Sequence, residues 1–404
     1  MKRRVRAAAA IAVPLAGCAL VPAAACGRPP ALRAKAAALV EPSTGSVVLG
    51  RAADSPRAIA SATKLMTVLL VLERSSLDTI VTAPVYHPLP AESVLGLRAG
   101  ERLAVRDLLR AVLLASANDA AMALAIHVGG TRASFVRSMN ARARALGLRH
   151  THYANPIGLD EHGNYSSAAD LVSLTRVLLR NSFFARTVAM SRARISGGAR
   201  RRTVSNRNIL VGRYPFVVGV KTGHTIDAGY VLVGAGRRNG VTVISAVLGE
   251  PSEAARDADT LALIRYGLGR YRLARAVRRG QVLARVRLRY RDTRVALVPR
   301  LSIARVVPKD AHVTIAVTGV PATVAGPLPA GARVGTVVVR AGGRIVARTA
   351  LITQRAVAKA SLAQRLGDYL SRTFTLVLLG ALLVCSLQLA LLRRRAGRRG
   401  VTSG

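Results

Sequence analysis

The segment "SATKLMT", residues 61–67, places a serine three residues before a lysine at the start of an apolar run with helical spacing. On a helix, residues i and i+3 share a face, so the Lys64 side chain can fold back to the Ser61 hydroxyl. The apolar stripe that includes Leu65 and Leu69 would bury this helix and favour neutral lysine, the form that a general base requires. The pair is either an activated nucleophile or a helix cap followed by a chance lysine, because serine is common at helix starts.

Lysine is scarce in this chain, which favours the first of these interpretations. Of 61 basic residues only six are lysines, and the other 55 are arginines. Arginine does not release its proton in a protein, whereas lysine can, and two chosen basic sites would both be lysine by chance about once in 120. Lys64 and Lys221 are two such sites, and this supports a chemical role for both.

A second polar cluster, "SAND" at residues 116–119, interrupts a helix-rich stretch. A Ser-x-Asn arrangement can aim a hydroxyl and an amide into one cleft, so that Ser116 relays a proton and Asn118 holds a substrate amide. The alternative is an ordinary helix end with its cap.

A third cluster, "KTGHT" at residues 221–225, ends a β-rich run. An edge strand at this point can pair with an extended peptide, and Gly223 leaves room for a second backbone to approach. Lys221 with the hydroxyls of Thr222 and Thr225 would form a site for a terminal carboxylate.

Other reactive side chains fit no metal or thiol chemistry. His150 and His152 have an i, i+2 spacing, but no Cys, Asp or Glu cluster accompanies them, so we expect no metal site. Cys18 and Cys26 lie in or beside an N-terminal apolar segment, and Cys385 lies in a C-terminal one. No cysteine is left between them to act as a nucleophile, and we expect no cofactor.

Hydrophobic periodicity and turn residues predict the helices and strands that position these three clusters. One strand pair precedes a series of helices, and three strands and a closing helix follow, two of the strands being joined by an Asn-Gly turn. This order predicts an α/β domain with a mostly antiparallel sheet whose first and last elements are adjacent. The predicted ranges are a hairpin at 36–49, helical stretches at 61–72, 105–128 and 167–180, strands at 216–223, 229–236 and 241–249, and a helix at 255–271.

The remaining segments predict an exported protein with a membrane anchor. Residues 1–25 have a basic start and an apolar core typical of a signal peptide, with "AAA" at 23–25 or a lipobox-like Cys18 as alternative processing sites. Short strands over 272–355 predict a small β-sandwich or barrel, and 356–372 a linker. Residues 373–392 carry no charge over 20 positions, long enough to span a bilayer. The basic tail 393–404 would then be cytoplasmic and the catalytic domain extracytoplasmic.

The formal net charge of +42 does not identify a partner by itself. The arginines are spread over the whole chain and no nucleic-acid-binding motif accompanies them, so we expect no nucleic-acid partner. Two explanations stay open, an arginine-biased composition and attraction to the anionic polymers of a cell wall or to acidic lipid.

The segments "IASATKLMT", "ASANDAA", "HYANPIGLD" and "GVKTGHTIDAGYVLV" occur in the order found in one family. In these motifs the chain resembles the D-alanyl-D-alanine carboxypeptidases, which are low-molecular-mass penicillin-binding proteins. The resemblance covers roughly 34–355. It implies a β-lactamase/transpeptidase-like α/β domain over 34–271, and removal of the terminal D-alanine from peptidoglycan stem peptides. β-Lactams would be covalent inhibitors.

The resemblance also implies a role for each matching residue. Ser61 would be the acyl-enzyme nucleophile, Lys64 its base, and Ser116 the proton relay to the leaving D-alanine. The substrate-binding set would comprise Asn118, Lys221, Thr222, Gly223, His224 and Thr225, with the backbone N–H groups of Ser61 and His224 as the oxyanion hole. Arg256, 35 residues after Lys221, is the candidate for the arginine that meets the substrate carboxylate.

Three alternatives stay open beside this reading. A D,D-endopeptidase would share all of these residues. A β-lactamase is disfavoured because no acid occupies the spot near "NPIGLD" where class A β-lactamases carry a deacylating glutamate, and because of the added β-rich domain. A non-catalytic wall-binding protein would be expected to have lost Ser61, Lys64 or Lys221, and all three are present.

Overall fold

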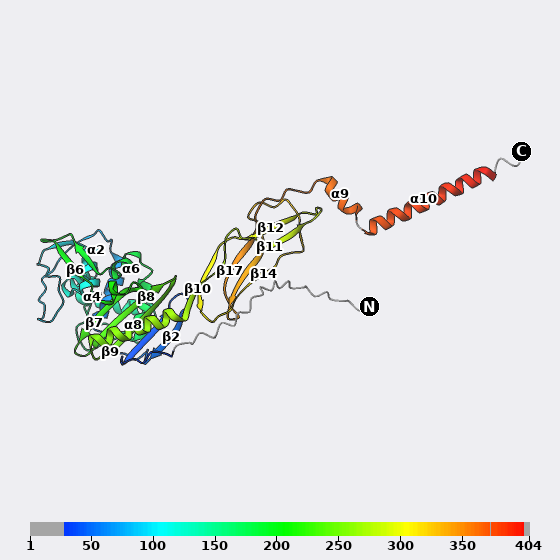
Figure 1. Cartoon of the computed structure of the whole chain (residues 1–404). Helices are drawn as coiled ribbons and strands as arrows, with labels where there is room; N and C mark the ends of the chain where they lie inside the picture. The colour runs from blue at the N-terminus through cyan, green and yellow to red at the C-terminus, as the bar shows by residue number, and fades with distance from the viewer. Residues whose placement is uncertain (1–27, 372, 400–404) are drawn as a thin grey trace.

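The computed structural model describes residues 28–371 and 373–399 of the chain. The predicted signal segment 1–25, with its alternative processing sites, lies outside the described residues, as does the end of the basic tail. Three parts follow one another in Figure 1: a mixed unit of helices and strands, an elongated β-rich unit, and two C-terminal helices.

A five-stranded sheet forms the centre of the first unit, here called the α/β unit. Its order is β2-β1-β9-β8-β7, and every neighbouring pair is antiparallel. The fold predicted from the sequence is therefore confirmed, including the pairing of the first strand with the last. The strands are β1 Ala36–Glu41, β2 Ser46–Arg51, β7 Val217–Thr225, β8 Gly229–Arg238 and β9 Val241–Glu250.

Local chemistry explains where this sheet turns. Asn239 and Gly240 connect β8 to β9 with φ values of 51° and 78°, as the Asn-Gly signal for a two-residue hairpin requires. At the edge of the sheet, β7 has only β8 as a strand neighbour among the described residues. The edge position of this strand agrees with the sequence, and its pairing with an extended peptide stays a prediction.

Helices cover both faces of the sheet. Helix α8, Glu253–Arg270, packs against β1, β8 and β9 on one face and forms an apolar core there with Leu263, Ile264 and Leu268. The other face is covered by a larger cluster that includes α1 Lys64–Arg74, α3 Asn118–Gly129 and α5 Ala168–Leu178. The active-site motifs all lie on this second side or on the edge strand.

Smaller elements complete the α/β unit. They include two small antiparallel sheets of two strands each, β3 with β4 and β5 with β6. The elements are η1 Ala60–Thr63, β3 Ile80–Thr82, β4 Arg102–Ala104, α2 Val105–Arg110, η2 Ala111–Ala115, α4 Arg132–Ala145, α6 Ser182–Val188, β5 Arg192–Ile195, β6 Arg202–Ser205 and α7 Leu210–Arg213.

Two sheets pack together in the β-rich unit. A six-stranded sheet has the order β14-β16-β17-β12-β11-β15, and a two-stranded sheet pairs β10 with β13. Val277 and Ile303 of the small sheet share an apolar core with Val337, Val339 and Leu351 of the large one. The strands are β10 Tyr271–Val277, β11 Ala284–Leu288, β12 Arg294–Pro299, β13 Ile303–Pro308, β14 Val313–Thr318, β15 Thr323–Val324, β16 Arg333–Ala341 and β17 Arg344–Thr353.

The chain ends in two helices beyond the β-rich unit (Figure 1). Helix α9, Leu362–Leu370, begins with a capping box between Ser361 and Gln364, and Arg291 of the β11–β12 turn donates to the Gln364 side chain at 2.9 Å. Helix α10 spans Thr373–Arg399, and its segment Thr375–Arg394 is long and apolar enough to cross a membrane.

Candidate active site

Lys64 is fully buried, and its ammonium lies against the candidate nucleophile. Lys64 Nζ donates to Ser61 Oγ at 2.9 Å and also to the carbonyl oxygen of Ile157. Burial is the largest cause that lowers the pKa of Lys64 to about 7, with Glu92 opposing this shift and Arg207 adding to it. A substantial fraction of Lys64 is therefore neutral at physiological pH, as proton abstraction from a hydroxyl requires.

Ser61 does not cap a helix. It lies inside the 3₁₀ turn η1, and α1 begins only at Lys64, whose preceding residue Thr63 makes no side-chain capping bond. The helical segment expected to open at Ser61 is present without a break from Ala60 to Arg74, but its first turn is 3₁₀ and not α. The physical reason is tertiary, because Ala60 has φ 45° and the turn is held between two other segments of the chain.

Two glycines hold this turn from opposite segments. A Cβ at Gly158 of the "NPIG" loop would lie 2.0 Å from the Ala60 carbonyl oxygen. A Cβ at Gly223 of β7 would lie 3.0 Å from the Ser61 backbone nitrogen, again too close for a side chain to fit without movement. The sequence predicted that Gly223 leaves room for a backbone, and the backbone that approaches it is the nucleophile turn of the chain itself.

The "SAND" segment breaks the helix beside this turn. Helix η2 ends at Ser116, which has a left-handed conformation with φ 63°, and α3 starts at Asn118. Helix η2 contacts both α1 and β7, so the break faces the same region as the nucleophile turn. Ser116 is the C-cap of η2, and its backbone N–H donates to the Ala111 carbonyl, so the alternative of a capped helix end is also present here. No side-chain capping bond forms at the start of α3.

Asn118 presents an unused acceptor. Its amide nitrogen donates to Glu92 Oε2 at 2.7 Å, while its Oδ1 atom is buried and has no hydrogen-bond partner among the described residues. A buried acceptor without a partner costs free energy, and a substrate N–H would satisfy it. This orientation suits the predicted role of Asn118 as the holder of a substrate amide.

The third motif lies on the edge strand β7. Lys221 is 1% exposed, and its Nζ donates to the carbonyl oxygen of Thr222 at 2.9 Å. Burial first, and then the positive charges of Lys64, Arg207 and Arg256, lower the pKa of Lys221 well below its usual value. A site with two buried lysines favours the binding of an anion. A negative charge would offset the repulsion between the two ammonium groups and the free-energy cost of burying them.

The end of β7 is fixed by its own hairpin. The His224 ring stacks on Tyr230 of β8 with ring centroids 4.0 Å apart, and Thr225 Oγ1 accepts from the Ala228 N–H at 3.3 Å. A hollow of about 610 Å³ extends past His224 and Thr225 toward Lys35 and Arg57.

Arg256 lies on α8, and its guanidinium is already paired. It is 3% exposed and contacts Glu253 at 2.6 Å and Asp257 at 2.8 Å. Its charge reaches Lys221, but no hydrogen bond connects it to the other motif residues. Its role toward a substrate carboxylate therefore stays a prediction.

Three residues near the lysines were not predicted from the sequence. Glu92 accepts from Asn118 and from the Tyr86 hydroxyl; burial alone would raise the pKa of Glu92, but these hydrogen bonds outweigh burial and lower it. The Ile157 carbonyl receives the Lys64 ammonium, and Arg207, which is exposed, depresses the pKa of both lysines. All three lie in irregular segments, where periodicity carries no signal.

Comparison with known proteins gives consistent results. Residues 23–252 match the family described as D-alanyl-D-alanine carboxypeptidase. The chain is 30% identical to D-alanyl-D-alanine carboxypeptidase DacD of Escherichia coli K12, covering 85% of this chain and 91% of that protein. It is 27% identical to DacF of Bacillus subtilis strain 168, covering 83% and 90%.

Solved structures agree with this. Penicillin binding protein 5 from Haemophilus influenzae aligns with a TM-score of 0.61 at 27% identity, covering 82% of this chain and 99% of that one. The Streptomyces K15 DD-transpeptidase aligns with a TM-score of 0.56 at 34% identity, covering 59% and 98%.

Proposed function

Because this chain belongs to the D-alanyl-D-alanine carboxypeptidase family of serine peptidases, we propose that Ser61, Lys64 and Lys221 carry out the family's reaction in it. The protein is a penicillin-binding serine carboxypeptidase that acts on D-Ala-D-Ala peptides of peptidoglycan. The observation that carries the residue assignment is the 2.9 Å contact between the wholly buried Lys64 ammonium and the Ser61 hydroxyl.

The reaction follows from this contact. Neutral Lys64 takes the Ser61 proton, and Oγ attacks the carbonyl carbon of the penultimate D-alanine. The C–N bond of the tetrahedral intermediate breaks, and the proton passes to the departing amine directly or through Ser116. Water then attacks the ester and gives one proton to Lys64. Lys64 returns that proton to the departing Ser61 Oγ, and the shortened peptide and the free serine are released. No step requires a cofactor.

The proposed substrate-binding roles rest on the burial of Lys221, the edge position of β7 and the unpaired oxygen of Asn118. The peptide would extend along the open side of β7, with its terminal carboxylate near Thr222, Thr225 and the positive field of Lys221. The unpaired Asn118 Oδ1 would accept a peptide N–H. The backbone N–H groups of Ser61 and His224 would stabilise the developing oxyanion.

Labelling with a fluorescent penicillin tests the assignment of the nucleophile. We expect stoichiometric acylation of the wild type and none in Ser61→Ala, together with loss of D-alanine release from a pentapeptide. Ser75→Ala is the matched control, because Ser75 follows the C-terminal end of the same helix α1 and should label normally. Labelling that persists in Ser61→Ala would refute the assignment.

A transpeptidase activity is a second candidate, because the Streptomyces K15 structure that this chain resembles is titled a DD-transpeptidase. The two reactions share the acyl-enzyme and differ in whether water or an amine accepts the acyl group. Product analysis on a pentapeptide with and without added amino-acid acceptor separates them. Cleavage of a crosslinked peptide dimer in the same assay would show the alternative D,D-endopeptidase activity.

We also propose that α10 anchors the enzyme in the cell membrane, with the catalytic unit outside and the tail after Leu392 inside. The apolar segment Thr375–Arg394 is unburied in the structure, and the basic run that follows favours a cytoplasmic end. Protease added to intact protoplasts should release the catalytic unit and spare an epitope attached to the C-terminus. Cleavage of that epitope in intact protoplasts would reverse the proposed orientation.

A further inference from the structure

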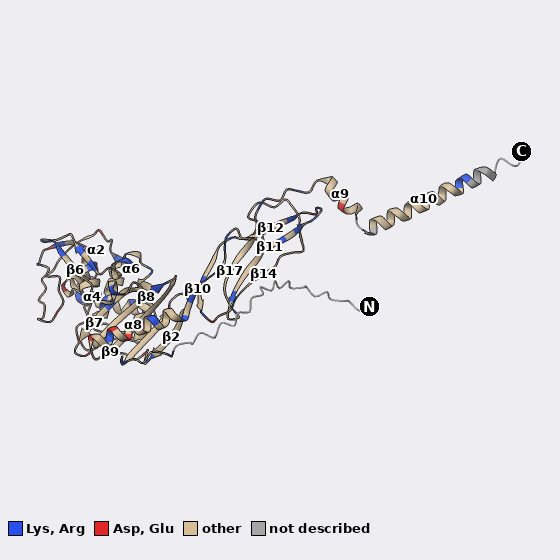
Figure 2. Ribbon diagram, viewed as in Figure 1, with Lys and Arg blue, Asp and Glu red and all other residues tan. Residues whose placement is uncertain are grey.

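Charge is distributed unequally between the two folded units. Residues 272–355 contain 17 Lys and Arg against two Asp and no Glu, whereas residues 28–271 contain 32 Lys and Arg against 16 Asp and Glu. Figure 2 shows blue segments in both units and the red ones gathered mainly in the α/β unit. An arginine-biased composition explains the many arginines of both units, but it does not explain why residues 272–355 contain so few Asp and Glu residues.

Part of this charge is arranged on the outer face of the six-stranded sheet, which we call the arginine face and define by Arg333, Arg340 and Arg348. In the β16–β17 register, Arg340 lies opposite Ile345 and Arg348 lies opposite Val338. A register shift after Arg333 brings it to the same side. The inner face of the same strands carries the apolar core.

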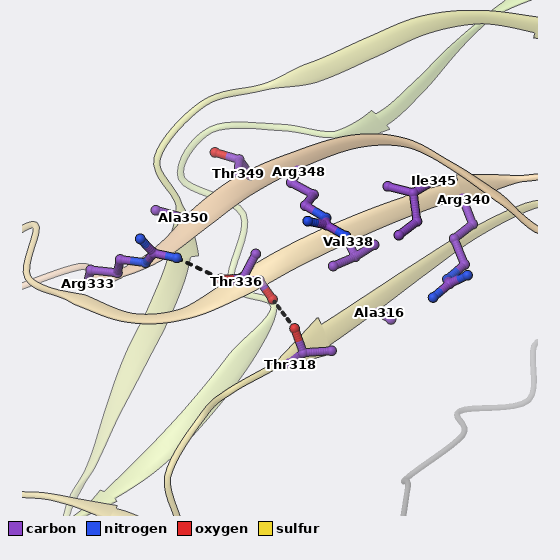
Figure 3. Close-up of a pocket in the computed structure, with 10 residues that line it drawn as sticks. All are labelled: Ala316, Thr318, Arg333, Thr336, Val338, Arg340, Ile345, Arg348, Thr349 and Ala350. Carbon is purple, nitrogen blue, oxygen red and sulfur yellow. Dashed lines mark hydrogen bonds between the residues drawn. The ribbon is translucent and has the colours of Figure 1, made fainter.

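The arginine face is hollowed and has hydroxyl groups beside its cations (Figure 3). Ala316 and Val338 are small floor residues in a depression of about 570 Å³, and Thr318 lies opposite Thr336 across the β14–β16 pair. Guanidinium forks and hydroxyl donors together are the groups that bind phosphate oxygens in proteins.

Within the part of the chain that the structure describes, the guanidinium groups of this face have no carboxylate partner. Arg333 donates to Thr336 Oγ1 at 3.2 Å and Arg340 donates to the Gly343 carbonyl at 3.2 Å. Arg348 makes no hydrogen bond or ion pair with any residue that the structure describes. The strands β14, β16 and β17 contain no Asp or Glu at all. The charges of this face are therefore available to an external anion.

We propose that the arginine face binds a linear phosphodiester polymer. Arg333 and Arg340 stand at the two ends of β16, roughly 23 Å apart at the usual rise per strand residue, with Arg348 between them. Cations spaced along a line match the repeated charges of such a chain. None of the residues lining the depression is aromatic, so bases have no stacking platform on it.

The orientation of the arginine face relative to α10 favours a polymer, and not a bilayer surface, as the bound partner. Strands β16 and β17 run along the length of the β-rich unit, while α9 and α10 leave from one end of that unit (Figure 1). A membrane that holds α10 lies beyond this end and does not face the side of the sheet. A polymer that rises from the membrane would run parallel to the strands.

Fluorescein-labelled poly(glycerol phosphate) is the probe for this proposal, with the full chain held in nanodiscs of zwitterionic lipid. The face variant is Arg333→Gln, Arg340→Gln and Arg348→Gln together. The matched control is Arg275→Gln, Arg279→Gln and Arg305→Gln, which removes the same charge from exposed arginines on or beside β10 and β13. Thermal unfolding of the full chain reports whether each variant is folded in the β-rich unit. Penicillin acylation of each variant reports on the α/β unit, and it fails separately if the catalytic assignment is wrong.

We expect the face variant to weaken polymer binding at least tenfold and the control to weaken it less than twofold, with binding that decreases as salt is raised. Equal loss in both variants would overturn the proposal in favour of general charge attraction. Absence of polymer binding by the wild type, or binding of phosphatidylglycerol vesicles alone that depends on the same arginines, would also overturn it.

Discussion

The α/β unit and the β-rich unit use the same arginine-rich composition in different ways. In the α/β unit the buried Glu101 pairs with Arg202 at 2.7 Å, and Asp119 accepts from the Leu95, Gly96 and Leu97 N–H groups. The β-rich unit has one ion pair within the described residues, Arg287 with Asp292 at 3.8 Å, and both side chains are exposed. The α/β unit therefore has buried charges with a structural role beside its exposed ones, whereas the ion pair of the β-rich unit is exposed.

This difference also separates the two kinds of basic residue. The lysines of the active site are desolvated, and Lys64 is suited to its proposed role because it can lose a proton. The arginines of the β-rich unit are suited to binding an anion, because a guanidinium keeps its proton and its positive charge. Substitutions that replace a lysine by an arginine, or remove a buried or an exposed charge, test this difference between the two units most directly.

The largest expected effect is that of Lys64→Arg, which keeps the positive charge and removes the base. Because a guanidinium stays protonated, we expect the rate of penicillin acylation to fall about 1000-fold or more. Lys309→Arg, at an exposed position after β13, should acylate at the wild-type rate. Rapid-mixing kinetics with a chromogenic β-lactam provide the measurement, and wild-type rates in Lys64→Arg would refute the base role.

The next effect concerns stability. Glu101→Gln breaks a buried ion pair in which both side chains are under 10% exposed, so we expect a loss of about 3 kcal/mol of unfolding free energy. Asp292→Asn breaks the exposed pair of the β-rich unit and should cost about 0.5 kcal/mol or less. Urea titration of both variants gives the comparison, and equal losses would contradict the distinction between internal and external charge.

The same carboxylate predicts the sign of a pH effect on the wild type. Hydrogen bonds from Arg202, opposed by burial, lower the pKa of Glu101 from 4.5 to about 2. The stabilisation is therefore fully present above pH 4.5 and is lost as pH falls toward 2.

A tenfold effect is expected from the pH dependence of acylation. With a Lys64 pKa of about 7, the neutral base is lost as pH falls, so the rate should drop about tenfold per pH unit below 7 and level off above it. Acylation that is flat or rises toward low pH would contradict the assignment of Lys64.

The smallest expected effect is that of Arg348→Gln on folding. Arg348 is exposed and has no partner among the described residues, so we expect a change within about 0.5 kcal/mol in unfolding free energy. Thermal unfolding of the full chain measures it. A large destabilisation would show that this arginine serves the fold of the β-rich unit and is not reserved for an outside partner.

Most of the fold was predictable because its elements carry local signals. The apolar runs of β8 and β9, the Asn239–Gly240 turn and the interruption of helix at "SAND" each depend on neighbouring residues. The three motifs also identified Lys64 and Lys221 as special, since lysine is rare in this chain.

The rest of the site depends on contacts between distant segments. The 3₁₀ turn at Ser61 is set by packing against Gly158, almost 100 residues later, and helix-start rules cannot show this. Glu92 and Arg207 reach the lysines from loops, through electrostatic contacts that no periodicity encodes. Sequence patterns therefore predict the groups that react, while the groups that adjust their pKa become visible only in the fold.

The two glycines that hold the nucleophile turn also limit how this enzyme can become insensitive to β-lactams. A variant that escapes the drug must reshape the site and still cleave its peptide. Side chains at Gly158 or Gly223 would displace the Ala60–Ser61 backbone, and drug and peptide need that backbone alike. Substitution at either glycine would therefore be expected to impair peptide cleavage together with β-lactam acylation.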